Sequence, residues 1–214
     1  MSSDYQTFRQ SPRGWLLHRA FAALYGAGAP IYDRFTSLVF AGEWSEWQRL
    51  ALRFVPPGAT VIELGCGTGQ LAAQGQKQAR RWIGIDRSAR MLRQARRRSG
   101  PRGPWLIQAD ARALPIADGA ANVVVTTFPA PFILEPATHA EIRRILRPGG
   151  QVVIILSGEL APNCPRRRIT RWILRLAYGR RDGTAVEQFA LPGFTGRVER
   201  LATPGGWADV YVGQ

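Results

Sequence analysis

Hydrophobic residues in the middle of the chain form short apolar runs that are separated by longer segments with apolar residues every three to four positions. The short runs are rich in β-branched residues, which is typical of strands buried on both faces of a parallel sheet. The longer segments carry apolar residues on one side only, which predicts amphipathic helices. This alternation predicts an α/β fold. The expected strands start near residue 60 and span 82–85, 105–108, 123–127 and 151–156, and the expected helices span 70–80, 87–98 and 136–146.

The two ends of the chain follow other patterns. Residues 1–54 contain apolar residues at helical spacing over 14–25 and again over 44–54, so they predict a helical section. After an expected loop at 157–165, residues 166–178 predict another helix. Residues 196–202 and 207–212 flank the turn Thr203-Pro-Gly-Gly206, which predicts an antiparallel hairpin. We expect one domain over 1–214, with the helical section at 1–54 and the α/β core at 55–214.

The first expected strand runs into three glycines at alternate positions, Gly65, Gly67 and Gly69. Strand, glycine turn and helix form the first half of a nucleotide-binding βαβ unit, because glycines permit a sharp turn and let a ligand approach the backbone. The spacing is G-x-G-x-G, with Glu63 two residues before the first glycine. It therefore differs from the G-x-G-x-x-G of dinucleotide-binding proteins.

Acidic and polar residues stand at the ends of the following strands. Asp86 closes the second strand about 20 residues after the glycine turn, where an acid accepts hydrogen bonds from ribose hydroxyls in NAD sites and related nucleotide sites. Asp110 follows the third strand, and Thr127 and Phe128 end the fourth. Because ligands of open α/β sheets lie beyond the carboxyl ends of the strands, we expect these residues around one site.

Composition narrows the chemistry. The net charge is +14, and Lys77 is the only lysine, so arginine supplies nearly all of the positive charge. A positive charge of this size creates an electrostatic field that attracts anions such as nucleic acid, phospholipid head groups and acidic metabolites. Genome composition also produces an arginine bias. No long apolar run or signal layout is present, so we expect a cytoplasmic protein without a transmembrane helix. Two cysteines form no disulfide framework, and no His/Cys spacing indicates a metal site.

The sequence Glu63-Leu-Gly-Cys-Gly-Thr-Gly69 resembles motif I of the class I S-adenosylmethionine (SAM) methyltransferases. The stretches 85–92, 109–115 and 141–150 also resemble the corresponding segments of this family, so the resemblance covers roughly residues 55–156. It implies a Rossmann-like seven-stranded sheet of order 3-2-1-4-5-7-6 flanked by helices, with SAM as cofactor. It also implies that residues 1–54 lie over the pocket as a lid, whereas the residues alone equally allow a helical layer at the sheet edge.

The resemblance assigns roles to individual residues. Asp86 would bind the ribose, the Asp110 carboxylate and the Ala111 amide would bind the adenine, and Thr127 and Phe128 would face the methionine part and the methyl group. No residue stands out as a catalytic base. The substrate-side candidates are Tyr25, Tyr32 and Asp33, where Tyr32-Asp33 resembles a pair common in small-molecule methyltransferases. The expected cofactor-binding residues are Glu63, Gly65, Cys66, Gly67, Gly69, Asp86, Arg87, Met91, Asp110, Ala111, Thr127 and Phe128.

These observations predict SAM-dependent methyl transfer to a small-molecule or lipid-like acceptor. Thr127-Phe-Pro-Ala130 lacks the Asn/Asp-Pro-Pro-Tyr typical of methylases that act on bases or glutamine. An RNA methyltransferase or nucleic-acid-binding module is the alternative that the +14 charge favours, but no aromatic residues interleave with the basic helix at 87–98. An NAD-dependent oxidoreductase is disfavoured by the G-x-G-x-G spacing, Asp110 and the hairpin.

Two expected helices, 14–25 and 166–178, combine large apolar residues with arginine. They indicate either apolar stripes packed on the sheet or peripheral contact with an anionic membrane. The acceptor atom and the oligomeric state are left open.

Overall fold

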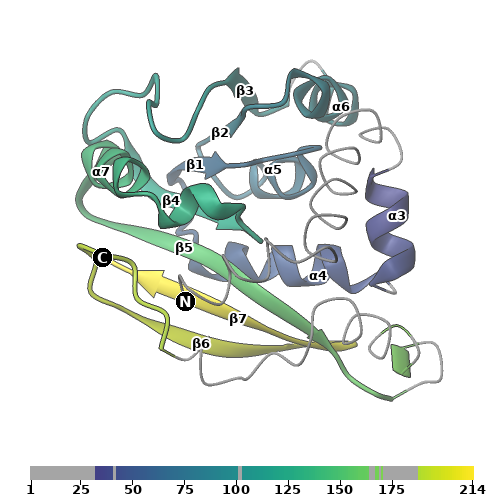
Figure 1. Cartoon of the computed structure of the whole chain (residues 1–214). Helices are drawn as coiled ribbons and strands as arrows, with labels where there is room; N and C mark the ends of the chain where they lie inside the picture. The colour runs from purple at the N-terminus through teal and green to yellow at the C-terminus, as the bar shows by residue number, and fades with distance from the viewer. Residues whose placement is uncertain (1–31, 41, 101–102, 164–166, 169, 171–187) are drawn as a thin grey trace, which may run out of the picture.

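A computed structural model of the chain describes residues 32–40, 42–100, 103–163, 167–168, 170 and 188–214 (Figure 1). A seven-stranded sheet forms its centre. Its order, β3-β2-β1-β4-β5-β7-β6, confirms the predicted topology. The strands are β1 (Thr60–Leu64), β2 (Arg81–Asp86), β3 (Trp105–Gln108), β4 (Ala121–Thr127), β5 (Leu146–Leu160), β6 (Gly196–Thr203) and β7 (Gly206–Gly213).

Strands β1 to β5 pair in parallel, and β7 pairs antiparallel with both β5 and β6. In β1, Val61, Ile62 and Leu64 are all 0% exposed, as expected for a strand covered on both faces. Because successive side chains point to opposite faces, Val61 and Ile62 belong to two separate apolar clusters. The sheet therefore has one hydrophobic core on each side.

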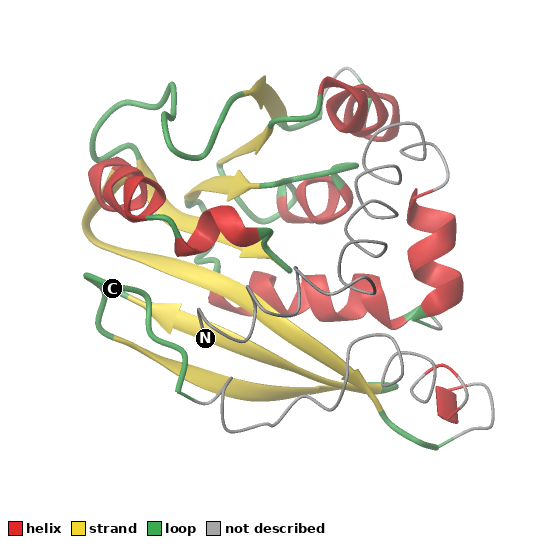
Figure 2. Cartoon of the chain, viewed as in Figure 1, coloured by secondary structure: helices red, strands yellow, loops and turns green. Residues whose placement is uncertain are grey.

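Helices cover both faces of the sheet (Figure 2). One apolar cluster packs the sheet against α4, η1 and α5, and the other packs it against η2 and α7. Helices α3, α4 and η1 precede β1, so most of the described residues before β1 are helical, as predicted. The helical elements are α3 (Tyr32–Val39), α4 (Glu43–Arg49), η1 (Leu50–Phe54), α5 (Gln70–Gly75), α6 (Ala89–Ser99), η2 (Pro131–Leu134) and α7 (Pro136–Ile145).

The largest differences from the predicted boundaries are at the end of α5 and at both ends of β5, which begins at Leu146 rather than near residue 151. Helix α5 ends at Gly75 rather than near residue 80. Gly75 lies against Trp82, because a Cβ at this position would lie only 2.0 Å from the Trp82 ring. The predicted loop at 157–165 is wrong over its first four residues, because β5 continues to Leu160. That extension pairs with β7, and the Ser157 hydroxyl donates a 2.6 Å hydrogen bond to Asp209.

The helix expected over 14–25 lies outside the described residues, as does most of the helix expected over 166–178. Within the described ranges, no helix is both long enough and apolar enough to cross a membrane. The same ranges contain no cluster of His, Cys, Asp and Glu side chains suited to holding a metal ion.

Candidate functional site

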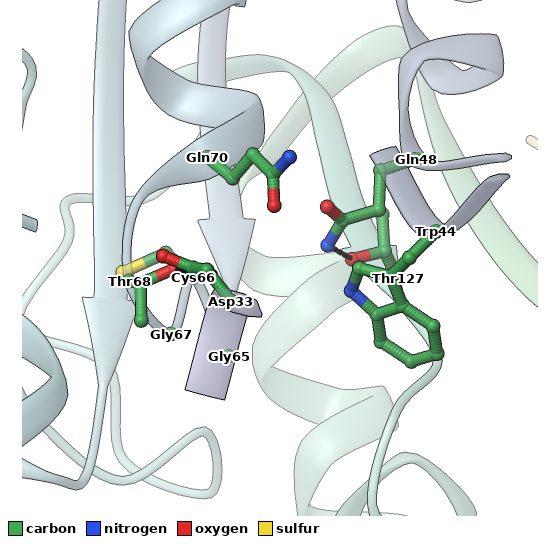
Figure 3. Close-up of a pocket in the computed structure, with 9 residues that line it drawn as sticks. All are labelled: Asp33, Trp44, Gln48, Gly65, Cys66, Gly67, Thr68, Gln70 and Thr127. Atoms are coloured by element: carbon green, nitrogen blue, oxygen red, sulfur yellow. Dashed lines mark hydrogen bonds between the residues drawn. The ribbon is translucent and has the colours of Figure 1, made fainter. Parts of the chain in front are cut away.

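A pocket lies where the carboxyl ends of β1 and β4 meet the helices that precede β1 (Figure 3). The turn after β1 forms one side of the pocket, with Asp33 of α3 against it, and Trp44 and Gln48 of α4 lie beside Thr127 on the other side. The residues that line it are Asp33, Trp44, Gln48, Gly65, Cys66, Gly67, Thr68, Gln70 and Thr127.

The glycine turn has a conformation that explains its sequence. Gly65, Gly67 and Gly69 have φ values of 70°, 53° and 71°, in the left-handed region where a side chain is strained. A Cβ at Gly69 would lie 2.8 Å from Ala95 of α6, so this glycine lets α5 and α6 approach. A Cβ at Gly67 would meet no atom within 4 Å. Gly67 therefore faces open space, where a ligand can contact the backbone.

Asp86 ties the end of β2 to the glycine turn. Its Oδ2 accepts a 2.9 Å hydrogen bond from the Gly67 amide, and its Oδ1 accepts a 2.7 Å bond from the Ser88 amide. Burial raises the pKa of Asp86, while both amides and the nearby Arg87 guanidinium oppose the rise. A carboxylate oxygen has more than one acceptor site, so both oxygens retain capacity for a ligand hydroxyl.

Asp110 stands just beyond β3 and is held by Arg112. Its carboxylate accepts from the Arg112 backbone amide at 3.0 Å and from the guanidinium at 2.9 and 2.7 Å. These contacts lower the pKa of Asp110 to about 2, so the group is ionised at neutral pH. Arg87 approaches the same carboxylate at 3.9 Å. The adenine contacts expected of Asp110 and Ala111 stay predictions, since neither residue lines the pocket in Figure 3.

Arg144 and Glu141 of α7 hold the loop that follows Asp110. The Arg144 guanidinium donates to the carbonyl oxygens of Leu114 and Ile116, at 2.9 and 2.7 Å. Glu141 accepts from the Leu114 amide at 2.6 Å and from Arg144. Helix α7 thus anchors the segment after β3, which sequence reasoning did not anticipate.

Three of the side chains expected at the cofactor are buried. Glu63 is 1% exposed, and its Oε2 accepts a 2.8 Å hydrogen bond from the Trp82 indole nitrogen. Burial raises the pKa of Glu63 to about 8, so this carboxyl is protonated at pH 7. Met91 is 0% exposed and packs on the inner side of α6. Cys66 lines the pocket, and burial raises the pKa of its thiol.

Asp33 connects α3 to the glycine turn. Its Oδ1 accepts a 2.7 Å hydrogen bond from the Thr68 hydroxyl, and its Oδ2 pairs with the Arg98 guanidinium of α6. The structure therefore places Asp33 at the pocket with both oxygens engaged. Tyr25 and the side chain of Tyr32 lie outside the described residues.

The opposite wall contains residues that sequence reasoning missed. Gln48 of α4 donates a 3.0 Å hydrogen bond from Nε2 to the Thr127 hydroxyl, and Trp44 lies one helical turn earlier. The Trp44 ring stacks on Phe128, with centroids 4.1 Å apart. Trp44 and Gln48 are four residues apart on a predicted helix, and residues i and i+4 share a helix face. This spacing was the sequence signal that could have identified them.

Phe128 has an unusual backbone. With φ of 49°, it is the one non-glycine residue with positive φ among those described. Its amide donates a 2.8 Å hydrogen bond to the Ile155 carbonyl, which holds the turn after β4 in place. Left-handed conformations of bulky residues cluster at functional sites, because the surrounding structure must compensate for their strain.

Comparison with known proteins agrees with this geometry. Residues 61–150 match the family described as methyltransferase domain. The 2-phytyl-1,4-naphtoquinone methyltransferase of Thermosynechococcus vestitus is 33% identical over 141 residues, which is 62% of each chain. The malonyl-[acyl-carrier protein] O-methyltransferase of Pectobacterium atrosepticum is 29% identical, over 81% of this chain and 64% of that protein. The chain thus spans less than two thirds of the length of these relatives.

Solved structures share the fold. A Methanococcus maripaludis protein classed with the S-adenosyl-L-methionine-dependent methyltransferases has a TM-score of 0.61 and 22% identity, covering 87% of this chain and 92% of its own. The S-adenosylmethionine-dependent methyltransferase of Mesorhizobium loti has a TM-score of 0.53 and 21% identity, over 78% and 98% of the two chains. Over residues 61–150 the chain thus resembles methyltransferases in sequence, and its seven-stranded sheet has the order of the Rossmann-like methyltransferase fold.

Proposed function

We propose that this protein transfers a methyl group from SAM to a small-molecule or lipid-like acceptor. The observation that carries the proposal is the pocket itself. It joins open space over Gly67 to Thr127 at the end of β4, and Asp86 stands directly behind the turn. When bound, SAM supplies an electrophilic methyl group on its sulfonium sulfur.

The residues present fit this cofactor. The free acceptor capacity of Asp86 suits the two ribose hydroxyls, because a buried carboxylate forms strong charge-assisted hydrogen bonds. The ionised Asp110 can accept from the adenine amino group, with the Ala111 amide beside it as a donor. Gly67 leaves room for the ligand against the backbone.

The chain's own contribution to the reaction is binding, alignment and exclusion of water. Helix α4 forms the pocket wall opposite the glycine turn, and Asp33 fastens α3 to the turn through Thr68 and to α6 through Arg98. Holding two reactants in line lowers the barrier to transfer without requiring a catalytic base. Among the described acids near the pocket, Asp33 is ion-paired, Glu63 is buried against Trp82 and Asp86 accepts from the Gly67 and Ser88 amides. None of the three is placed as a catalytic base, so the acceptor proton would pass to solvent as the product leaves.

The names of the relatives support the acceptor class. One is named for a phytyl naphthoquinone and another for an acyl group on a carrier protein. Both names describe acceptors with apolar parts, and the aromatic wall at Trp44 and Phe128 is compatible with such a compound. Peripheral contact with an anionic membrane, where a lipid-like acceptor resides, is part of the proposal, and so is a cytoplasmic location.

A thermal-shift assay tests the cofactor assignment. A ligand that binds only the folded state raises the melting temperature, so SAM and S-adenosylhomocysteine should each stabilise the protein while NAD does not. Stabilisation by NAD alone would contradict the proposal and favour an oxidoreductase. Binding of RNA that weakens steeply with salt, with no methylated product, would mark the +14 charge as a source of nonspecific attraction.

A further inference from the structure

The pocket wall that α3 and α4 contribute consists of Asp33, Trp44 and Gln48, and the family match over residues 61–150 does not include it. Trp44 and Gln48 lie beside Thr127 at the end of β4, whereas Asp33 lies against the glycine turn. Under the proposed function, Thr127 lies next to the transferable methyl group. The polar groups of this wall therefore meet the methyl acceptor.

The side-chain oxygen of Gln48 is a hydrogen-bond acceptor without a partner among the described residues. Gln48 donates a 3.0 Å hydrogen bond from Nε2 to the Thr127 hydroxyl. Its Oε1 is buried and accepts no hydrogen bond from any described residue. In Figure 3 this oxygen points across the pocket toward the side of Gln70. A buried acceptor without a partner is unfavourable, and a ligand donor would satisfy it.

Trp44 presents the matching donor. Its ring stacks on Phe128 at 4.1 Å and on Phe40 at 4.9 Å, so its neighbours take up the ring faces. The ring edge is left for the pocket, and in Figure 3 the indole nitrogen lies on the side that faces Gln48 and Thr127. An indole nitrogen only donates, whereas the Gln48 carbonyl only accepts.

Among the described residues, this wall presents no unpaired ionised side chain to the pocket. The Asp33 carboxylate, which is its one ionisable group in the pocket, is paired with Arg98 and accepts from Thr68. A cationic acceptor would therefore find no unpaired carboxylate among the described lining residues. An anionic acceptor would face the unpartnered Gln48 oxygen.

We propose that the Trp44 N–H and the Gln48 C=O together bind an uncharged hydroxyl group of the methyl acceptor. A hydroxyl donates and accepts at once, so it satisfies both groups. An ammonium only donates and a carboxylate only accepts, so each leaves one of the two protein groups unpaired. This inference rests on the proposed function and narrows its acceptor to alcohols, phenols or hydroquinones.

Calorimetry on protein saturated with S-adenosylhomocysteine tests the inference with three probes: 2-naphthol, 2-naphthoate and (2-naphthyl)methylammonium. We expect 2-naphthol to bind at least about tenfold more tightly than either charged probe, because a lost buried hydrogen bond has roughly that effect. Gln48→Leu and Trp44→Phe should each weaken 2-naphthol binding by about tenfold, a larger loss than either causes in S-adenosylhomocysteine affinity. Trp105→Phe, at a side chain 59% exposed and outside the pocket lining, is the matched control and should change neither affinity.

Tighter binding of a charged probe would overturn the inference. So would Gln48→Leu and Trp44→Phe proteins that retain wild-type affinity for 2-naphthol. Either result leaves the proposed function standing, provided that the wild-type protein binds S-adenosylhomocysteine. A wild-type protein that fails to bind S-adenosylhomocysteine would instead overturn the proposed function, and this inference with it.

Discussion

The buried carboxyl of Glu63 predicts an unusual dependence of stability on pH. Burial raises its pKa from 4.5 to about 8, so the folded protein keeps a proton that the unfolded chain releases above pH 4.5. Because the folded state then binds more protons, the free energy of unfolding should fall as pH rises between these two values. Each pH unit in that window corresponds to about 1.4 kcal/mol, which gives a total of about 5 kcal/mol from Glu63 as an order of magnitude.

Replacing Glu63 with glutamine removes this dependence and keeps the structure. The amide oxygen of Gln can still accept from the Trp82 indole, and no proton is titrated. We expect Glu63→Gln to match the wild type near pH 5 and to be more stable by several kcal/mol, about 3 to 5, at pH 8.5. Urea unfolding at both pH values measures the difference.

Glu141→Gln is the matched control with the opposite sign. Arg144 lowers the pKa of Glu141, so its charged form stabilises the fold above the unfolded pKa, and that stability is lost as pH falls. Glu141→Gln should therefore be destabilising at pH 8.5. If Glu63→Gln differs from the wild type by the same amount at pH 5 and pH 8.5, Glu63 is not protonated in the folded protein and the reasoning fails.

Three further predictions concern packing and surface charge. Gly75→Ala should lower the free energy of unfolding by about 1–3 kcal/mol, because its Cβ would overlap the Trp82 ring; unchanged urea unfolding would contradict the contact. Glu43→Ala should cost about 3 kcal/mol by leaving the partly buried Arg167 without its 3.1 Å partner, and a melting temperature equal to the wild type would refute this. Co-sedimentation with phosphatidylglycerol vesicles, but not with phosphatidylcholine vesicles, is expected at low salt, because each arginine near an anionic surface contributes about 1 kcal/mol. Protein that stays in the supernatant with both vesicles would exclude the membrane contact.

Much of the fold was predictable because local patterns determine it. The strand Trp105–Gln108 and the terminal hairpin lie where the apolar runs and the turn residues predicted them. The glycine turn and Asp86 also meet at one edge of the sheet as expected, since parallel strands bring their carboxyl ends together.

The remainder depends on contacts between distant segments. The end of α5 at Gly75 coincides with packing against the Trp82 ring, and the extension of β5 to Leu160 follows from its pairing with β7. The roles of Asp33 and Gln48 depend on how α3 and α4 lie against the sheet. The four-residue spacing of Trp44 and Gln48 puts both on one helix face, but it does not reveal which part of the sheet that face contacts.

Calorimetric titration with SAM tests the central claim most directly when the wild type is compared with Gly67→Ala and Gly58→Ala. Both glycines have positive φ, at 53° and 75°, and neither would place a Cβ within 4 Å of another atom. The two substitutions therefore impose similar backbone strain, but only Gly67 lines the pocket. The account predicts that the wild type and Gly58→Ala bind SAM alike and that Gly67→Ala binds at least about tenfold more weakly, a loss of about 1.4 kcal/mol. Equal SAM affinity in all three proteins, or no binding by the wild type, would contradict it.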